Sequence, residues 1–349
     1  MRQYDRNGQN YRLANGLTPF QLDMQIHLTD WKWNRLKTRE CGCYKGQPYD
    51  VILPDRLKDE LQPIYRPIVA RVEEHKRLLP FKLHKFVGHM ASSQVACINL
   101  FIPLLVQPEE AAQVLKQVNP DLVSIATDQL DQGFQIEFWP GKGDDPGPLN
   151  DHTEAAGTDA DIAIAYRDAD GRLKLWLIEH KLTEAEFTTC GGARSRGRTG
   201  QHRCRPAADI QRDHDLCYYH KSERCQYAYW TITDRHPEVF PPERLAAHEA
   251  CPFKGGMNQL WRNMLQALAT EDAPGLPYAK VHFSVVHHPD NKALTPSMAA
   301  FSMLLGDQDR FSSFTSDRIV NAAADLPTLH DWAAWYKELY RIGPGNGAG

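Results

Sequence analysis

Two carboxylates and one amine stand at the ends of neighbouring apolar segments: Asp161 opens one segment, and Glu179 and Lys181 close the next. Side chains alternate between the two faces of a strand, so Glu179 and Lys181 point to one face and His180 to the other. Two adjacent carboxylates repel each other, and a hard divalent cation such as Mg²⁺ removes that repulsion. The residues therefore predict a metal site served by Asp161 and Glu179. The alternative is a salt-bridged strand end, because Glu-x-Lys is common by chance.

The two apolar segments, residues 161–166 and 173–178, predict the strands that position these groups. Between them, Asp168–Gly171 has the residue types that close a β-hairpin. The second segment is nearly all apolar, as in a strand buried on both faces. A carboxylate and an amine that emerge together from such a strand are costly to desolvate unless they serve each other or a ligand.

The order Asp161, hairpin, Glu179-His180-Lys181 resembles the Asp…Glu-x-Lys signature of the PD-(D/E)XK nuclease superfamily. More closely, the chain resembles a family of bacterial restriction-endonuclease-like proteins over roughly residues 80–290. The ordered motifs that carry this resemblance are Ser92-Ser93-Gln94 with Asn99-Leu100-Phe101, then Thr158–Asp161, Leu175–Lys181 and Asn258-Gln259-Leu260-Trp261-Arg262-Asn263.

The resemblance implies metal-dependent hydrolysis of phosphodiester bonds in nucleic acid, with DNA as the expected substrate. Asp161, Glu179 and the carbonyl of His180 would hold Mg²⁺ or Mn²⁺. Lys181 would orient the attacking water or stabilise the charge that develops on the phosphate. Gln94 and Gln259 complete the expected catalytic set.

The apolar segment 92–106 predicts a helix that departs from the nuclease pattern. In that fold a helix in this place often lends a Glu to the metal site, whereas this helix contains no Glu and Gln94 is the comparable side chain. We expect Glu137 or Glu154 to substitute. Gln94 could instead cap a buried backbone group.

The composition is that of an ordinary soluble protein, with 42% hydrophobic and 24% charged residues among 349. The net charge of −4 means that a nucleic-acid site must be a local basic surface. The N-terminus lacks the apolar core of a signal peptide, and the longest apolar run, Ala96–Val106, is too short to cross a bilayer. We expect a cytoplasmic protein with no membrane partner, and a homodimer stays open.

An insertion at residues 188–226 is rich in Cys and Arg. One hypothesis is a zinc site, with an iron–sulfur cluster as a second metal alternative. The spacing matches no standard Cys-x₂-Cys ribbon, so an Arg-rich loop with incidental cysteines stays open too. The predicted zinc ligands are Cys190, Cys204, Cys217 and Cys225.

Four arginines are expected to contact nucleic acid, because a guanidinium stays charged and donates forked hydrogen bonds to phosphate. Arg194, Arg196 and Arg198 belong to the insertion. Arg262 belongs to the predicted helix that carries Gln259.

The order of elements predicts an α/β fold with a restriction-endonuclease-like core, a mixed central sheet flanked by helices. We expect an N-terminal helical lobe at 1–85, the core at 86–290 and a C-terminal helical segment at 291–349. The expected strands are 134–139, 161–166, 173–180, 226–233 and 280–287, and the expected helices are 63–78, 92–106, 109–118, 183–188, 257–270, 296–305 and 329–342.

Three other functions stay open. A degenerate nuclease core would bind nucleic acid but no metal. A nuclease could act on structured RNA or a strand end rather than on bulk DNA. A structural protein with buried ion pairs would lose only stability on substitution of Lys181.

Overall fold

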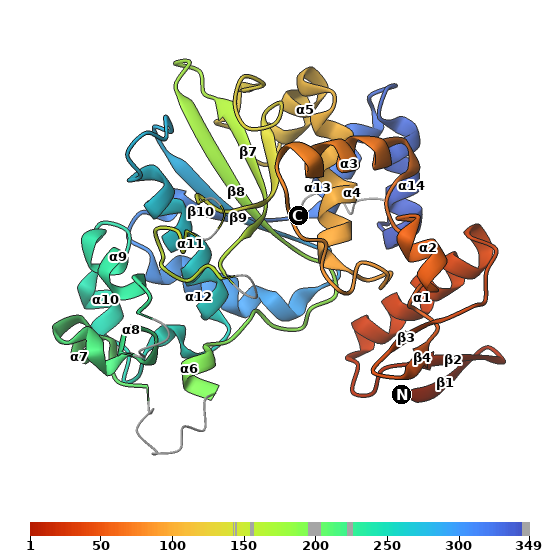
Figure 1. The fold of residues 1–349 in the computed structure, drawn as a ribbon, viewed down its shortest axis with the longest axis horizontal. Coiled ribbons are helices and arrows are strands. Elements are labelled where there is room, and N and C mark those ends of the chain that lie inside the picture. Colours follow the sequence, from red (N-terminus) through yellow and green to blue (C-terminus); the bar gives the residue numbers. More distant parts are fainter. Residues whose placement is uncertain (142, 144, 154–156, 195–203, 222–225, 344–349) are drawn as a thin grey trace.

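A six-stranded mixed sheet forms the centre of the computed structural model, with helices on both faces (Figure 1). The structure describes all of the 349 residues except 142, 144, 154–156, 195–203, 222–225 and 344–349. The strand order is β10-β9-β8-β7-β5, and β6 also pairs with β7. The strands are β5 (Ser124–Ile125), β6 (Phe134–Phe138), β7 (Ala160–Arg167), β8 (Leu173–Lys181), β9 (Val281–His287) and β10 (Phe311–Thr315).

Strands β7 and β8 form the predicted hairpin. Their antiparallel register runs from Ile162 opposite Ile178 to Arg167 opposite Leu173. At the turn, the Asp168 carboxylate accepts backbone N–H bonds, and Gly171 has a φ of 75°, which a residue without a Cβ adopts without strain. β8 then pairs in parallel with β9, so this strand is central.

The two faces of the sheet pack into separate apolar clusters, because alternate residues of β8 point to opposite sides. Trp176 and Ile178 belong to the cluster that contains helix α4 (Ser93–Leu105). Leu175 and Leu177 belong to the cluster that contains helix α11 (Met257–Glu271). The sheet therefore lies between α4 and α11, the two helices whose motifs the sequence associated with the site.

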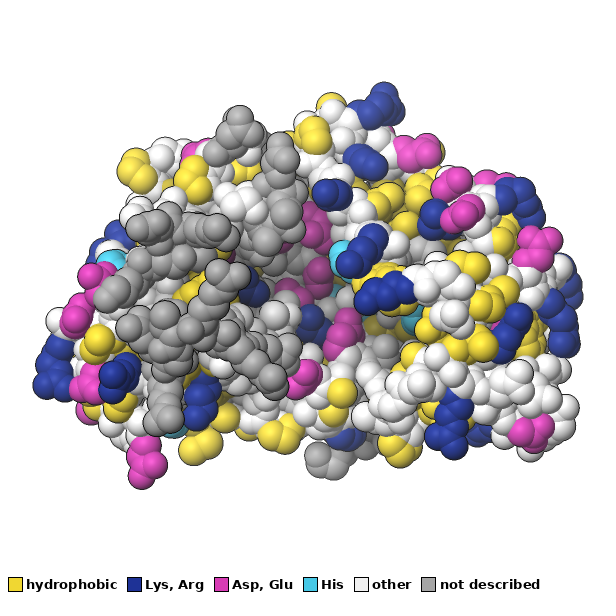
Figure 2. Space-filling model, turned by 60° about the horizontal axis from the view of Figure 1, so that its bottom comes forward, with side chains coloured by type: hydrophobic (Ala, Val, Ile, Leu, Met, Phe, Trp, Pro, Cys, Tyr) yellow, Lys and Arg dark blue, Asp and Glu magenta, His cyan; other side chains and the backbone are white. Residues whose placement is uncertain are grey.

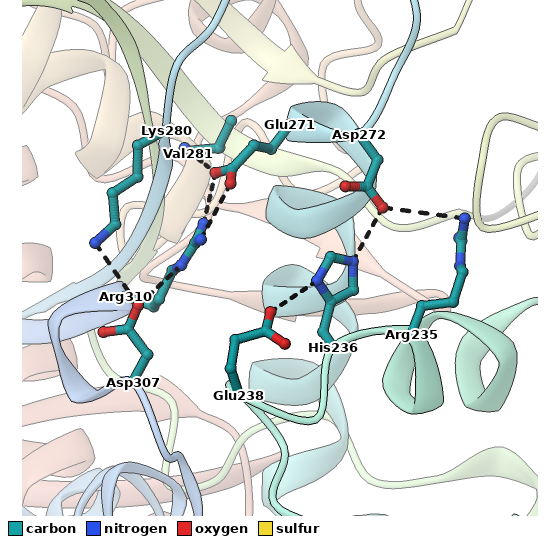
Figure 3. Close-up of polar contacts among 9 residues, drawn as sticks. All are labelled: Arg235, His236, Glu238, Glu271, Asp272, Lys280, Val281, Asp307 and Arg310. Atoms are coloured by element: carbon teal, nitrogen blue, oxygen red, sulfur yellow. Dashed lines mark hydrogen bonds and ion pairs between the residues drawn. The ribbon is translucent and has the colours of Figure 1, made fainter.

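The C-terminal end of α11 is fixed by ion pairs, which Figure 3 shows. Arg310 lies 2.5 Å from Glu271, and the same carboxylate accepts the backbone N–H of Val281 at 2.7 Å. On the other side, Asp272 lies 3.0 Å from His236. The network also includes Arg235, Glu238, Lys280 and Asp307. These contacts fix the far end of the helix whose first turns reach the candidate site.

Most of the predicted core elements are confirmed, and most of their ends shift by no more than two residues. The exceptions are the helix predicted at 63–78, which begins six residues later, and the helix predicted at 109–118, which ends three residues earlier. The confirmed strands are β6 to β9. The confirmed helices are α3 (Val69–Leu78), α4, α5 (Pro108–Leu115), α11, α12 (Thr295–Leu304) and α14 (His330–Tyr340). The general fold class, a mixed sheet flanked by helices, is also confirmed.

Two predicted elements are wrong. Residues 183–188 form no helix, since the Glu184 carboxylate accepts the backbone N–H groups of Leu182 and Thr183 and so competes with helical bonding. Residues 226–233 form no strand; most of this segment lies in helix α9 (Tyr229–Arg235). Its buried residues have helical spacing, so tertiary packing outweighs their strand propensity.

Both terminal regions contain strands that the sequence did not predict. The N-terminal lobe holds two hairpins, β1 (Arg2–Arg6) with β2 (Gln9–Leu13) and β3 (Gly42–Tyr44) with β4 (Gln47–Tyr49), around helix α1 (Pro19–Arg35). In the C-terminal segment, β10 extends the central sheet beside β9, and helix α13 (Ser316–Ala324) follows. The predicted boundaries at 86 and 290 stay predictions, although one apolar cluster contains residues from all three regions.

Among the described residues, no single helix is long and apolar enough to cross a membrane. The helices α4 and α5 meet that test only as a pair, and they are bent by 116° at the break between them.

Candidate active site

Three carboxylates form a row across three neighbouring strands. The β6–β7 register pairs the residues on either side of Glu137 with those on either side of Asp161, so these two acids lie opposite each other. The β7–β8 register, extended one residue beyond Ile162 and Ile178, places Asp161 opposite Glu179. The sequence predicted the pair Asp161 and Glu179 and proposed Glu137 as a substitute acid. The structure brings all three acids together.

Glu137 occupies a strained position in β6. Its φ is 51°, in the left-handed region that residues with a Cβ rarely adopt. Ile136 packs in the cluster on the α4 side, whereas Phe138 packs in the cluster on the α11 side, so the alternation of the strand breaks between them. The ladder also omits a Glu137–Asp161 pair. Strain of this kind persists where surrounding structure enforces it, often at functional sites.

Gln94, near the start of α4, holds Glu137. Its amide Nε2 donates to Glu137 Oε1 at 2.7 Å, and its Oε1 accepts the backbone N–H of His84 at 2.8 Å. The Ser92 side chain accepts the N–H of Val95 and caps the helix, which fixes the first turn. Gln94 therefore bonds backbone groups, as the capping alternative predicts, and it also contacts an acid of the row; its catalytic role stays a prediction.

Two amides and one amine surround Glu179. Gln259 Nε2 donates to Glu179 Oε1 at 2.7 Å, and Asn263 Nδ2 donates to Glu179 Oε2 at 2.9 Å. Lys181 Nζ lies 2.9 Å from Glu179 Oε1. Gln259 and Asn263 are four residues apart on α11, so they lie on one face of that helix. Asn263 is the contact that sequence reasoning missed, and its spacing from Gln259 was the available signal.

The site concentrates negative charge away from water. Burial, followed by repulsion from Glu179 and Glu137, raises the pKa of Asp161 well above its usual range. Burial also raises the pKa of Glu137 to about 8, although the Gln94 hydrogen bond acts in the opposite direction. Burial alone would lower the pKa of Lys181, but the nearby carboxylates, Glu179 foremost, raise it, so this amine stays charged.

His180 takes part through its backbone. Its N–H donates to Asp161 Oδ2 at 2.6 Å, and this bond joins β7 and β8 at the level of the acids. Its imidazole points to the other face, as alternation predicted, and is fully buried, with neither ring nitrogen hydrogen-bonded within the described part of the chain. Burial lowers the pKa of His180 to about 3, so the ring is neutral.

A stacked pair on the loop after β6 lies next to the row. Trp139 stacks on His152 with ring centroids 3.8 Å apart, and His152 Nε2 lies 2.6 Å from Asp159 Oδ1. Asp159 is close enough to Glu137 to repel its charge. A Cβ at Gly157 would come within 2.3 Å of the His152 ring, so this close approach requires glycine.

Acidic side chains lie in a hollow near the centre of the face shown in Figure 2, and Lys and Arg side chains flank it on the side of the N-terminal lobe. In the segment before α4, Lys82 and Lys85 are exposed. The backbone carbonyl of Lys82 accepts a hydrogen bond from Gln94 Nε2 at 3.1 Å. The segment that carries these lysines is therefore attached to the residue that holds Glu137.

The structure describes only some of the remaining predicted residues. Arg262 lies on α11, where Tyr229 accepts its hydrogen bond and Asp151 is close, so its side chain is engaged inside the protein. Arg194 is the last residue of the short helix α6 (Gly191–Arg194). Arg196, Arg198, Cys225 and Glu154 lie outside the described residues.

A divalent ion fits the chemistry of the acid row. Within the described ranges, no group of three or more His, Cys, Asp or Glu side chains is arranged to hold a metal ion. Mg²⁺ commonly takes only one or two carboxylates and fills its shell with other oxygens, so Asp161 and Glu179 suffice in number. Two buried, mutually repelling carboxylates are the observation that favours a cation here.

The chain matches a family model. A family model described as Restriction Endonuclease associating with ARP matches residues 25–341. That description indicates a nuclease family, and a nuclease family implies nucleic acid as the substrate class. Among curated proteins and solved structures, none matches the chain.

Proposed function

Because this chain belongs to the restriction-endonuclease family that its residues 25–341 match, we propose that it is a metal-dependent nuclease that hydrolyses phosphodiester bonds, with DNA as its substrate. The observation that carries the proposal is the row Glu137, Asp161 and Glu179 beside the buried Lys181. Raised pKa values at two of these acids, Glu137 and Asp161, next to the charged amine of Lys181 favour catalysis over a purely structural ion pair.

Asp161 and Glu179, with the carbonyl of His180, would hold Mg²⁺ or Mn²⁺. When bound, the ion supplies neutralisation of the phosphate charge and a lowered pKa for the attacking water. Glu179 Oε1 accepts two hydrogen bonds and Oε2 accepts one from described residues, so Oε2 keeps a lone pair for an ion. Gln259 and Asn263 fix the plane of this carboxylate.

The positive charge of Lys181 would stabilise the negative charge that develops on the phosphate group. Its ammonium is buried beside Glu179 and stays protonated, so it can orient a water molecule or stabilise an oxyanion but does not serve as a base. Glu137, with its pKa near neutrality, is the acid best suited to accept a proton from water.

Nucleic acid would approach across the segment at 82–86. The exposed amines of Lys82 and Lys85 lie on the segment that Gln94 bonds, and each phosphate contact by such a side chain is independent of base sequence. Arg194, Arg196 and Arg198 remain proposed phosphate contacts. Arg262 would have to leave Tyr229 and Asp151 to reach a phosphate.

The test is cleavage of single- and double-stranded DNA and RNA, each with Mn²⁺, with Mg²⁺ and with EDTA. We expect metal-dependent cleavage of DNA by the wild type and none by Asp161→Asn or Glu179→Ala. Titration calorimetry should show metal binding to the wild type only. Cleavage that persists in both variants would refute the assignment of these acids.

A second candidate function, nucleic-acid binding by a degenerate nuclease core, follows from Gln94 in place of the expected helix Glu. It predicts nucleic-acid binding with neither cleavage nor metal binding. RNA cleavage without DNA cleavage would instead identify an RNA nuclease.

A further inference from the structure

Four cysteines from three stretches of the chain line one small cavity on the α11 side of the sheet. The cavity measures about 30 Å³, and aromatic rings, including Trp230 and Phe253, complete its wall. All four are free thiols. They are Cys190, Cys204, Cys217 and Cys251.

Backbone N–H groups point at two of these sulfurs. Cys217 accepts hydrogen bonds from the N–H groups of Tyr219 and His220, and Cys251 accepts one from the N–H of Phe253. Clustered N–H groups of this kind form a positive pocket that stabilises an anion. Burial raises the pKa of Cys217 and of Cys251, and these N–H groups act in the opposite direction. The local backbone is therefore suited to thiolates, and Arg205 in the cavity wall and Lys254 near Cys204 add positive charge.

Backbone bonds hold the cysteine-bearing segments together. The N–H of Cys190 donates to Lys254 O at 3.3 Å, and the N–H of Cys251 donates to Arg205 O at 2.8 Å. The four sulfurs thus come from three stretches of chain that the fold itself brings to one place. The helices of this part of the chain, α6, α7 (Ala207–Arg212) and α8 (Tyr218–Lys221), are short.

We propose that Cys190, Cys204, Cys217 and Cys251 bind one zinc ion through four thiolates. Zinc prefers tetrahedral thiolate sets, and a cavity of about 30 Å³ has room for a single ion rather than for an iron–sulfur cluster. No group of three or more His, Cys, Asp or Glu side chains among the described residues is arranged to hold an ion, so zinc binding requires these side chains to rearrange. The fourth ligand is Cys251 rather than the predicted Cys225, which lies outside the described residues.

The zinc site goes beyond the nuclease proposal, and it would stabilise the position of a side chain that contacts Glu179. Cys190 follows the catalytic strand β8, and Cys251 precedes α11. At the start of α11, Gln259 accepts the N–H of Thr188, which lies just before Cys190 in the sequence, through its Oε1 at 3.1 Å. The Nε2 of the same side chain donates to Glu179. A zinc ion would fix the exit of β8 against the first turn of α11 and so keep Gln259 on Glu179.

The primary experiment is elemental analysis of the full chain purified without added metal. We expect one zinc per wild-type chain and at least a tenfold loss of zinc in Cys251→Ser. Cys225→Ser and the exposed-thiol control Cys43→Ser should keep the wild-type content. Lys181→Met should also keep it, which separates a failure of the zinc proposal from a failure of the nuclease proposal.

A measurement on the wild type covers the case in which Cys251→Ser does not fold. Titration with an organomercurial should release the zinc only as four thiols react, and cobalt substitution should give the absorption of a tetrahedral thiolate site. Zinc absent from the wild type, wild-type zinc in a folded Cys251→Ser, or iron with inorganic sulfide would each overturn the proposal.

Discussion

Gln94 Nε2 donates a 2.7 Å hydrogen bond to Glu137 Oε1, and this bond joins helix α4 to strand β6 at the level of the acid row. Gln94 stands where a helix Glu was expected, and it therefore holds Glu137, an acid that comes from strand β6. The left-handed φ of 51° at Glu137 turns the strand at this point. Strand β6 supplies the carboxylate of Glu137, and helix α4 supplies the amide that holds it.

The Gln94 contact predicts a positioning role. Gln94→Ala should lower kcat by roughly 10–100-fold, as loss of a residue that orients a metal-site ligand commonly does. Metal affinity measured by calorimetry should fall as well, while the thermal midpoint changes little. Gln107→Ala, just beyond the other end of the helix, removes only a bond to Pro103 O and should leave kcat unchanged. Equal kcat in both variants would contradict the role.

Lys181 predicts a separation of metal binding from turnover. Lys181→Met should reduce kcat by roughly 10²–10³-fold, because a preorganised charge at the transition state is lost, while Mn²⁺ still binds. Lys174→Met is the matched control, since this buried lysine of the same strand pairs with Asp121 and Asp168 away from the acids. The control should lose stability and keep kcat. A Lys181→Met enzyme with normal turnover would rule the amine out.

Asn263 predicts a contribution that sequence reasoning missed. Asn263→Ala removes the amide from Glu179 Oε2, so we expect a loss of about 10–100-fold in metal affinity or activity. Thr270→Ala, two turns further along α11, removes a bond only within the helix and should leave metal affinity intact. Calorimetric titration with Mn²⁺ compares the two, and matching affinities would show that Gln259 alone positions Glu179.

The raised pKa of Glu137 predicts how stability depends on pH without metal. Folding raises this pKa from 4.5 to about 8, so the protonated carboxyl stabilises the fold below pH 4.5 and that contribution is lost as pH rises toward 8. Asp161 acts in the same direction. In EDTA, the free energy of unfolding should therefore fall across this window because of these two groups.

Urea unfolding of Glu137→Gln at pH 5 and pH 8 tests this dependence. The variant should gain stability over the wild type at pH 8 and less at pH 5, whereas the exposed control Glu249→Gln should show no such difference. Saturating Mg²⁺ should flatten the wild-type decline, since a cation balances the ionised acids. A wild type that grows more stable from pH 5 to pH 8 in EDTA would refute the burial of these charges.

The sequence alone determined the hairpin of β7 and β8 and the sides to which its residues point. Period-two alternation fixed Glu179 and Lys181 on one face and His180 on the other, and the Asp168–Gly171 turn fixed the register that places Asp161 opposite Glu179. Strong helical periodicity likewise identified α11 and the face that carries Gln259. These features depend on neighbours close in the chain, so local patterns suffice to predict them.

Only the tertiary structure decided which distant residues meet. The Gln94 contact with Glu137, the Asn263 contact with Glu179 and the place of Cys251 beside Cys190 in the cysteine cavity join residues separated by dozens of positions. The same holds for α9, where packing against Trp261 imposed a helix on residues with strand propensity. Such contacts arise from the packing of helices on the sheet, and no spacing within one segment records them.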